Sequence, residues 1–396
     1  MDVRTGASGA LVADPGPAAV GSGIMSHSKI RVAVVFGGRS SEHAISCVTA
    51  GAVMAAIDRD RYEVVPIGIA RDGRWVLASG DQRLAIEDGR LPEVDGGGTA
   101  LALPFDPAGP GLLAVAPGEV PTALGEVDVV LPLLHGPFGE DGTIQGLLDL
   151  AGIRYVGAGV LASAVGMDKG FMKLVWQAQG LPVGPYVLVG DREWRRERKR
   201  KIDEIKELGL DAGRPVFVKP ARAGSSMGIS RVTSEDDLEA AVEAAREHDP
   251  KVIVEAAIEG REIECGVLQG LDDGPAEASL PAEVRTSGDS DFYDFETKYL
   301  DGATTMAIPP DLPETAIEEV RRIAVQAFEA LDCEGLARVD FFCTPDGRWV
   351  LNEINTMPGF TPASAFPQMW AATGLDYPAL VDRLIQTAAA RTTGLR

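Results

Sequence analysis

The chain has few cysteines and no long apolar run. Four cysteines occur in 396 residues, Cys47, Cys265, Cys333 and Cys343, and no two of them form a C-x-x-C pair. This spacing argues against a zinc site and against a disulfide scaffold, and it is typical of a protein of the reducing cytoplasm. Because no run of about eighteen apolar residues occurs, the sequence predicts no transmembrane helix.

Positive charge is also scarce. The sequence has 37 lysines and arginines against 59 acidic residues, which gives a formal net charge of -22. Nucleic acids and anionic membranes bind basic surfaces, so neither is expected as a main partner. One basic cluster, REWRRERKRK over 192–201, could form a nucleic-acid patch. Acidic residues are interleaved with it and follow it, which favours the alternative of a solvated helix face.

The first 28 residues lack the pattern of a secretory signal. They are rich in Gly, Ala, Ser and Pro, and Asp14, Pro15 and Pro17 interrupt any apolar core. We therefore expect a flexible extension over 1–28 and no secretory signal. Met25 is an alternative start, which N-terminal mass spectrometry of the native protein would test.

The length of the chain predicts two to three domains. Over 29–157 the strand-like runs RVAVVF, YEVVPIGIA and VDVVLPLL alternate with helical patterns and predict a small α/β domain with parallel strands. Loops or hairpin turns are expected over 79–126. A central domain over 158–257 is expected to hold one helix, SAVGMDKGFMKLVWQAQG, that Gly180 ends. The remainder, 258–396, is expected to hold further strands and two helices.

The stretch VFGGRSSEHAIS, residues 35–46, resembles the start of a nucleotide-binding fold but has the wrong chemistry for one. A strand runs into a glycine turn and then into a helical pattern. The dinucleotide fingerprint needs a third glycine, and this stretch has only two, next to each other. An acid, Glu42, follows them and would repel a pyrophosphate. The sequence alone leaves open what Glu42 binds.

A second glycine turn follows the run VFVKPARAGSSMGIS. Small residues after Lys219 allow backbone N–H groups to converge on an anion, and the lysine adds positive charge. No G-K-[ST] follows, so the stretch is not a Walker A loop. The alternative interpretation is a β-hairpin turn with a surface lysine.

The run GLARVDFFCTPDGRWVLNEINTMPG predicts a β-hairpin around the turn TPDGR. Side chains two residues apart share a strand face, so Arg338 and Asp340 point one way, as do Glu353 and Asn355. A hairpin can bring the two pairs together, which would make a magnesium site beside an arginine. The alternative is an outward polar face; four such residues in one array favour the metal site.

Two further segments carry polar residues in suggestive places. The segment LLHGPFGEDGTIQG begins at the carboxyl end of a strand, the edge where open α/β sheets bind ligands, and it includes His135. Glu140 and Asp141 in this segment could instead cap the following helix. The segment DFETKYLDG, with Lys298 and Tyr299, could be a mobile lid or an ordinary surface loop.

Together these motifs resemble the ATP-grasp family and, within it, the D-alanine–D-alanine ligases. The resemblance runs from about residue 30 to residue 390, and HGPFGEDGTIQG and the hairpin run are its most specific parts. It implies an α/β protein with an ATP-grasp fold, two α+β subdomains (158–257 and 258–396) that clasp ATP, preceded by a small parallel-sheet α/β N-terminal domain. It also implies ATP and two Mg²⁺ (or Mn²⁺) ions, a cytoplasmic homodimer and a role in peptidoglycan precursor synthesis.

The resemblance further implies a reaction. ATP phosphorylates the carboxylate of one D-alanine, and the amine of a second D-alanine attacks the acyl phosphate to give the dipeptide. A D-alanine–D-lactate or D-alanine–D-serine ligase is the nearest alternative, and Tyr299 beside Lys298 speaks against the lactate form. A non-catalytic nucleotide sensor on the same fold is a second alternative, which the intact metal and arginine set disfavours.

Roles for individual residues are likewise implied by the resemblance. Glu42 binds the ammonium group of the first D-alanine, and a Glu42–Ser225–Tyr299 link joins the first domain, the glycine loop and the lid. Arg338 and the N–H of Gly359 stabilise the oxyanion. His135, Lys298 and Ser364 contact the substrates. Asp340, Glu353 and Asn355 bind metal. ATP is held by Lys169, Lys219, Ser226, Met227, Gly228, Glu255, Ile258, Glu262 and Asn352.

Overall fold

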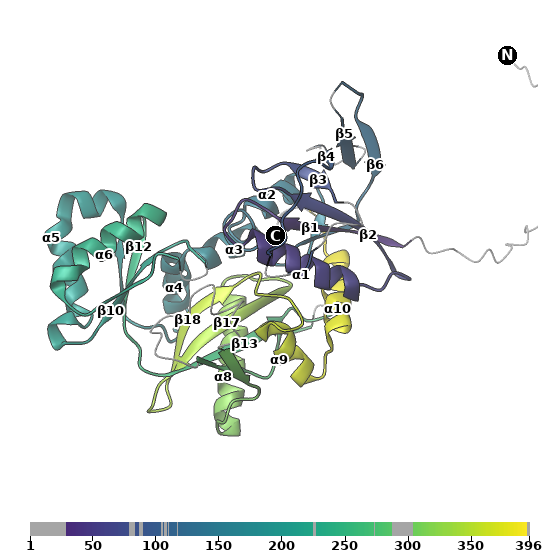
Figure 1. Ribbon diagram of the computed structural model, residues 1–396. Helices are drawn as coiled ribbons and strands as arrows, with labels where there is room; N and C mark the ends of the chain where they lie inside the picture. Colours follow the sequence, from purple (N-terminus) through teal and green to yellow (C-terminus); the bar gives the residue numbers. More distant parts are fainter. Residues whose placement is uncertain are drawn as a thin grey trace, which may run out of the picture.

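The computed structural model describes residues 29–78, 84–86, 90–103, 106, 109, 111–116, 118–224, 227–272, 274–286 and 304–393. Within this part of the chain three β-sheets have eight, four and six strands, and helices pack against each (Figure 1). Ser225, Ser226, Lys298, Tyr299 and the extension over 1–28 lie outside the described residues.

The N-terminal sheet contains the predicted parallel strands. Strand β1 pairs in parallel with β2 and β7, and β7 pairs in parallel with β8. These strands are β1 (Ile30–Gly37), β2 (Tyr62–Ile69), β7 (Val129–Pro132) and β8 (Arg154–Tyr155), with helices α1 (His43–Ala56) and α2 (Thr143–Leu150) in the connections. The predicted parallel α/β layer is therefore confirmed.

The region expected to hold loops or hairpin turns adds three antiparallel strands to the same sheet. They follow β3 (Trp75–Leu77) and are β4 (Thr99–Ala102), β5 (Leu112–Val115) and β6 (Thr122–Gly125). Most of their residues are exposed or half-buried. The apolar alternation that marks a strand is consequently weak, and the sequence did not reveal them as strands.

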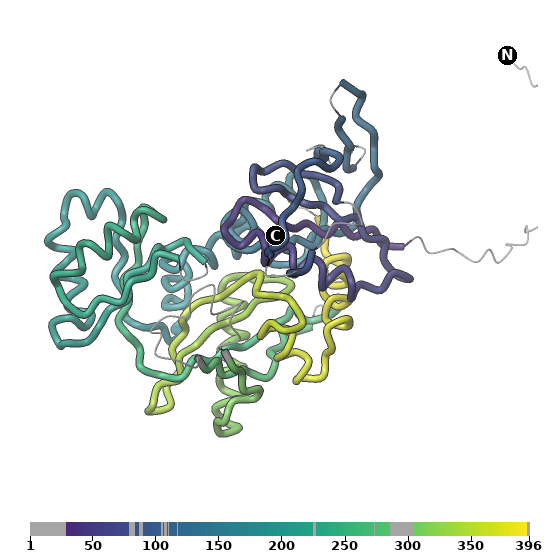
Figure 2. The backbone as a smooth tube through the Cα atoms, in the orientation of Figure 1, coloured from purple at the N-terminus to yellow at the C-terminus, as the bar shows by residue number. Residues whose placement is uncertain are grey.

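Strand β1 is buried on both of its faces. Val32, Val34 and Phe36 point to a core that includes the last helix of the described chain, α10 (Tyr377–Ala390), whereas Ala33 and Val35 pack toward α2. A strand covered on both sides reads as a continuous apolar run, as RVAVVF does. Figure 2 shows the yellow C-terminal segment beside the purple N-terminal one, and α10 contacts α1, β7 and β8.

The single helix predicted after residue 160 is wrong, because the structure has two. Helix α3 (Val160–Met167) ends and α4 (Lys169–Ala178) begins at Asp168. The Asp168 carboxylate accepts hydrogen bonds from the N–H groups of Gly170 at 3.0 Å and Phe171 at 3.1 Å, which is N-capping. The chain then passes Gly180, whose φ is +73°.

The central sheet stands at the left of Figure 1, covered by two helices. Its strands are β9 (Tyr186–Val189), β10 (Val216–Pro220), β11 (Ser230–Val232) and β12 (Val252–Ala256); the helices are α5 (Asp191–Glu207) and α6 (Glu235–His248), with a 3-10 turn, η1 (Leu210–Ala212). The basic cluster lies on α5, and Arg200 there pairs with Glu193, Glu197 and Glu204. These pairs favour the solvated helix face over a nucleic-acid patch.

The C-terminal sheet contains the predicted hairpin as β17 (Leu336–Cys343) and β18 (Trp349–Asn355). Its other strands are β13 (Arg261–Leu268), β14 (Glu277–Ala278), β15 (Ala282–Thr286) and β16 (Thr304–Ala307). Three helices, not the expected two, occur in the described part of 258–396: α8 (Glu314–Ala330), α9 (Ala365–Thr373) and α10. None of the helices within the described residues is long and apolar enough to cross a bilayer.

Candidate active site

A cleft of about 590 Å³ is lined by residues of all three sheets and their connections. Every predicted site residue that the structure describes lines it, except Gly228. Gly228 has a φ of +70°, and a Cβ there would lie 2.5 Å from the His248 ring. Glycine at this position therefore allows the turn into β11, and contact of its amide with a phosphate remains a prediction.

The hairpin presents Arg338, Asp340, Glu353 and Asn355 together. Arg338 lies opposite Asn355 in the register, and Asp340 lies opposite Glu353. Arg338 donates two hydrogen bonds to Asp340, both 2.7 Å long, and the Asn355 amide donates to Asp340 Oδ2 at 3.1 Å. Burial would lower the pKa of Arg338, but Asp340 and Glu264 raise it well above its usual value, so the guanidinium stays charged.

A β-bulge explains the place of Asn352 in the site. The register skips one residue of β18, because Asp340 lies opposite Glu353 while Phe341 lies opposite Leu351. Asn352 is the extra residue, and such a residue is left unpaired in the ladder. Its carbonyl oxygen accepts a hydrogen bond from Lys173 Nζ at 2.9 Å.

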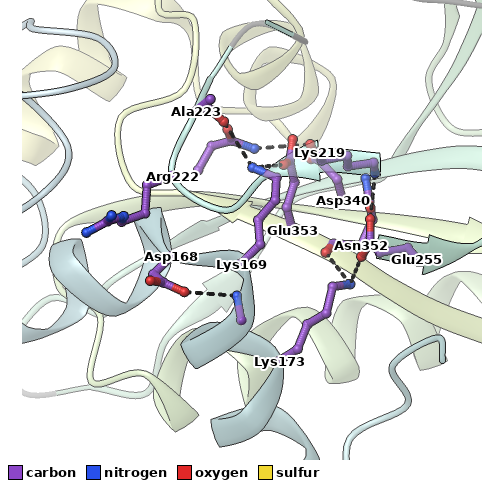
Figure 3. Close-up of polar contacts among 12 residues, drawn as sticks. Asp168, Lys169, Lys173, Lys219, Arg222, Ala223, Glu255, Asp340, Asn352 and Glu353 are labelled. Atoms are coloured by element: carbon purple, nitrogen blue, oxygen red, sulfur yellow. Dashed lines mark hydrogen bonds and ion pairs between the residues drawn. The ribbon is translucent and has the colours of Figure 1, made fainter. Parts of the chain in front are cut away.

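Two lysines hold the carboxylate of Glu255 between them (Figure 3). Lys173 Nζ lies 2.8 Å from Glu255 Oε1, and Lys219 Nζ lies 2.6 Å from Oε2. Burial alone would raise the pKa of Glu255, but the two ammonium groups hold it well below its usual range. Burial opposes the charge of Lys219 as well, and Glu255 raises the lysine pKa in return. Glu255 and Lys219 therefore stay ionised in the cleft.

Lys173 was missed by sequence reasoning, although a signal existed. It lies one helical turn after Lys169 on α4, so both side chains share a face. A lysine on the buried face of a helix is rare unless it is paired, and the Lys173 side chain is only 3% exposed.

Lys169 joins the hairpin to the glycine loop. Its Nζ lies 3.1 Å from Glu353 Oε2 and donates to the Ala223 carbonyl oxygen at 3.1 Å (Figure 3). Lys169 is the first residue of α4, directly after the capping Asp168, and Lys251 Nζ lies 2.6 Å from Asp168 Oδ1. The break between α3 and α4 thus fixes the start of the helix that carries both lysines.

Glu42 also lines the cleft, and it lies directly before the start of α1. It is 8% exposed, and its carboxylate lies between two glycines. A Cβ added to Gly136 would lie 2.6 Å from Glu42 Oε2, and a Cβ added to Gly224 would lie 3.2 Å from the same oxygen. Gly224 precedes Ser225, so the carboxylate of Glu42 lies near the beginning of the glycine loop.

His135 and Glu140 both contact the loop that follows β18. His135 Nδ1 donates to the Met357 carbonyl oxygen at 3.0 Å, and Glu140 accepts from the Met357 N–H at 3.1 Å. Helix capping is thus the wrong interpretation for Glu140. Asp141 instead accepts from the Thr143 N–H at 3.0 Å at the start of α2. Burial and the charge of Glu42 raise the pKa of Glu140 to about 8.

The remaining predicted residues line the cleft beside these groups. Ser364 precedes α9, and its Oγ accepts a hydrogen bond from the Thr361 N–H at 3.1 Å. Ile258 follows β12, and its side chain packs near Gly184. Met227, Glu262 and Gly359 also line the cleft.

The donor set of the hairpin fits a hard divalent ion. Two carboxylates and one amide oxygen face the cleft beside Lys169, and oxygen donors of this kind suit Mg²⁺ and Mn²⁺. In the described ranges no group of three His, Cys, Asp or Glu side chains is spaced to hold a metal ion. An ion at Asp340, Glu353 and Asn355 would therefore depend on further oxygen ligands from a phosphate.

A cleft that has one lysine on strand β10 and two on helix α4, beside a hairpin that carries an arginine, two acids and an asparagine, is the site of an ATP-grasp enzyme. Two solved structures show the same architecture. The D-Ala:D-Ser ligase VanG from Enterococcus faecalis superposes with a TM-score of 0.77 and 34% identity, covering 91% of this chain and 100% of that chain. The D-alanine–D-alanine ligase from Coxiella burnetii gives 0.75 and 34%, covering 91% and 94%.

The chain belongs to the D-alanine–D-alanine ligase family. The family model "D-ala D-ala ligase N-terminus" matches residues 31–158, and "D-ala D-ala ligase C-terminus" matches residues 175–386. A D-alanine–D-alanine ligase from Kineococcus radiotolerans is 61% identical over 94% of this chain and 100% of its own length. One from Mycobacterium ulcerans is 56% identical over 93% and 98%. The predicted family and fold class are therefore confirmed.

Proposed function

We propose that the chain is an ATP-dependent, ADP-forming ligase that joins two D-alanine molecules into D-alanyl-D-alanine. The observation that supports this most is the cleft itself. The cleft contains a buried carboxylate, Glu42, that suits an ammonium group, and lysines that suit phosphates. The polar residues of the β17–β18 hairpin line the same cleft. Relatives that are 56% to 61% identical bear the name of this ligase.

ATP occupies the lysine-lined side of the cleft. Lys169 and Lys219, now paired with Glu353 and Glu255, would turn to the phosphates. The glycine loop, with Ser226, Met227 and Gly228, would cover these phosphates with backbone N–H groups. Glu255 and Ile258 would contact the adenine, Glu262 the ribose, and Asn352 would lie beside the nucleotide.

Asp340, Glu353 and Asn355 would hold two Mg²⁺ or Mn²⁺ ions. When bound there, such ions would supply positive charge against the charge that develops on the β- and γ-phosphates during transfer. Arg338 remains charged beside Asp340 and would stabilise the oxyanion of the tetrahedral intermediate, together with the Gly359 N–H.

The reaction has two steps that share one carbonyl carbon. A carboxylate oxygen of the first D-alanine attacks the γ-phosphorus, ADP leaves, and a D-alanyl phosphate forms. The amine of the second D-alanine then attacks the acyl carbon, loses a proton, and inorganic phosphate leaves with one former carboxylate oxygen. Amide formation needs this activation because a carboxylate is a poor electrophile, and water must be excluded because it would hydrolyse the acyl phosphate.

Substrate contacts come from the N-terminal domain and from the loop before α9. Glu42 would bind the first ammonium group, and His135 would lie near the first carboxylate. Ser364 and Lys298 would bind the second D-alanine, and a Glu42–Ser225–Tyr299 link would close the site. VanG, a D-Ala:D-Ser ligase, shares the fold at 34% identity, so the fold alone does not separate D-alanine from D-serine as the second substrate.

The experiment is ADP release by the purified protein with ATP and Mg²⁺, with products identified by mass. The substrates are D-alanine, L-alanine, and D-alanine mixed with D-serine or D-lactate. We expect ADP and the D-alanyl-D-alanine mass with D-alanine alone. A mixed product only would move the assignment to the serine or lactate ligases, and ATP binding without any ADP release would indicate a sensor.

We further propose that the enzyme is a cytoplasmic homodimer that supplies peptidoglycan precursors. Its four cysteines are buried free thiols, which suits a reducing compartment. Three exposed apolar side chains on the packed helices α2 and α3, Leu150, Val160 and Leu161, support an interface between subunits. Sedimentation would test the dimer, and a monomer at micromolar concentration would contradict it.

A further inference from the structure

The backbone of Met357 is held from both sides by one segment of the N-terminal domain. Its N–H donates to Glu140 Oε1 at 3.1 Å, and its carbonyl oxygen accepts from His135 Nδ1 at 3.0 Å. Glu140 Oε2 also accepts from the Gly136 N–H at 2.6 Å, so this one carboxylate bridges the two segments. The contact joins residues more than 200 positions apart in the sequence.

Met357 lies between two residues with proposed roles in the reaction. Two residues before it is Asn355, of the proposed metal set, and two residues after it is Gly359, of the proposed oxyanion site. Thr356 and Met357 are 6% and 7% exposed. Asn355 is held in the β17–β18 ladder opposite Arg338, whereas Gly359 lies beyond that ladder, so a shift of the Met357 peptide would mainly displace the Gly359 N–H.

The other end of the same contact reaches the first-substrate site. Glu42 packs against Gly136, since a Cβ on Gly136 would lie only 2.6 Å from Glu42 Oε2. The N–H of the same glycine donates to Glu140. The second ring nitrogen of His135, Nε2, is buried and has no hydrogen-bond partner among the described residues. Because Nδ1–H donates to Met357 and burial lowers the pKa of His135, Nε2 is left as a hydrogen-bond acceptor.

We propose that Glu140 is a positioning residue of the ligase reaction. Together with His135 it fixes the Met357 peptide, and so it sets the Gly359 N–H relative to the first D-alanine bound at Glu42. This inference rests on the proposed function. A carboxylate suits the task because each of its oxygens accepts one N–H, whereas an amide has a single acceptor oxygen.

The contact of Glu140 with the Met357 peptide is not expected to contribute mainly to the stability of the fold. Burial of a carboxyl group beside a second carboxylate opposes ionisation, and here it raises the pKa of Glu140 to about 8. Groups retained at a cost in stability are typical of functional sites. The variants are therefore compared above pH 8, where Glu140 is ionised, and loss of its second acceptor oxygen is expected to impair the reaction more than the fold.

The test compares Glu140→Gln with Asp141→Asn. Asp141 is a matched control, because it lies in the same segment and accepts from the N–H groups of Phe138 and Thr143, without contact to Met357. Three quantities are measured: kcat/KM for D-alanine, KM for ATP, and the number of ADP molecules released per dipeptide. Thermal unfolding reports whether each variant is folded.

Glu140→Gln is expected to lower kcat/KM for D-alanine by roughly 10- to 100-fold, the usual effect of losing a supporting contact. The KM for ATP should stay near the wild-type value. The ratio of ADP to dipeptide should rise above that of the wild type, since a displaced oxyanion site leaves the acyl phosphate to water. Asp141→Asn should keep the wild-type ratio.

A folded Glu140→Gln protein with wild-type ratio and wild-type kcat/KM would overturn the inference. If the Gln variant does not fold, Glu140→Asp replaces it. Its shorter side chain keeps the carboxyl group but cannot span both N–H groups, and the same rise in the ratio is expected. An unchanged ratio in a folded Asp variant would equally overturn the inference. Wild-type protein that forms no dipeptide would instead overturn the proposed function.

Discussion

At the scale of single residues, the molecule places ionised groups where burial disfavours them. Glu255 is ionised between Lys173 and Lys219, and Arg338 is ionised beside Asp340. Each charge is kept by its partners rather than by solvent. Incoming phosphate would take over as a partner for the lysines. Such an arrangement holds charges ready without any need to ionise them on binding.

Glu42 gives the sharpest prediction at this scale. Glu42→Gln removes the negative charge that would bind an ammonium group but keeps the shape of the side chain. We expect the KM for the first D-alanine to rise roughly 10- to 100-fold, because a hydrogen bond to a charged group contributes about 1.5–3 kcal/mol. The KM for ATP should change little. Steady-state kinetics with each substrate varied measures both.

The control for Glu42→Gln is Glu63→Gln, which removes an exposed partner of Arg31 far from the cleft. Equal D-alanine dependence in the wild type and in Glu42→Gln would remove Glu42 from the substrate site.

Because of His43, which follows Glu42 in the sequence, we expect the free energy of unfolding to depend on pH. Its Nδ1 donates to the Gly38 carbonyl oxygen, and its Nε2 accepts from the Val94 N–H at 3.0 Å, so the ring must be neutral. Burial lowers the pKa of His43 below the usual value of 6.5. As the pH falls below about 6.5, the unfolded chain then binds more protons than the folded chain. The free energy of unfolding therefore decreases as the pH decreases.

Urea unfolding at pH 7.5, 6.5 and 5.5 checks this pH dependence. His43→Asn, which keeps a donor for Gly38 but cannot titrate, should lose less stability than the wild type over the acidic part of this range. Parallel profiles for the two proteins would show that His43 is not responsible.

At the scale of elements, the loop that would cover the phosphates has a buried anchor. Asp249, at the end of α6, is 4% exposed and accepts from the Arg222 N–H at 2.9 Å and from its guanidinium at 2.7 and 3.0 Å. Burial would raise the pKa of Asp249, but these donors lower it. Arg222 begins the run that leads to Gly224, so this pair fixes the stem of the glycine loop.

Asp249→Asn should weaken the anchor and raise the KM for ATP by roughly tenfold, about 1.4 kcal/mol, with little change in the KM for D-alanine. Kinetics with ATP varied measures the effect. Asp346→Asn, at the exposed turn of the β17–β18 hairpin, serves as the control. A larger effect on D-alanine than on ATP would contradict the assignment of this loop to the phosphates.

The accuracy of prediction from sequence followed the strength of each local pattern. The β17–β18 hairpin and the parallel strands were predicted because their apolar periods and turn residues are strong. The strands β4, β5 and β6 were missed because few of their residues are buried. The break at Asp168 was missed because a capping aspartate also fits a helix interior by periodicity alone.

At the scale of the whole molecule, the two ends of the described chain form one core. Leu384 and Ile385 of α10 pack with Val34 of β1, and the Tyr62 hydroxyl donates to Asp382 at 2.6 Å. The chain therefore passes through the central and C-terminal sheets before its last helix completes the first domain. No local pattern in the sequence indicates such a return, because it depends on the packing of distant elements.

In the candidate site too, contacts between residues close in sequence could be predicted, whereas contacts between distant segments could not. Residues that share one strand, such as Arg338 and Asp340, could be placed together from their spacing. The contact of Glu140 with Met357 joins two domains and could not be placed in this way. The cleft is formed by this assembly, since Glu42, directly before α1, and Lys219, on β10 of the central sheet, line one cavity.

Activation of the D-alanine carboxylate by phosphoryl transfer is the step on which the proposed function depends. The most direct test uses D-alanine labelled with ¹⁸O in its carboxylate, with mass analysis of the phosphate released. The acyl phosphate route predicts one ¹⁸O in the inorganic phosphate for each dipeptide formed, because the leaving phosphate carries a carboxylate oxygen. Unlabelled phosphate alongside dipeptide, or AMP in place of ADP, would contradict the acyl phosphate route.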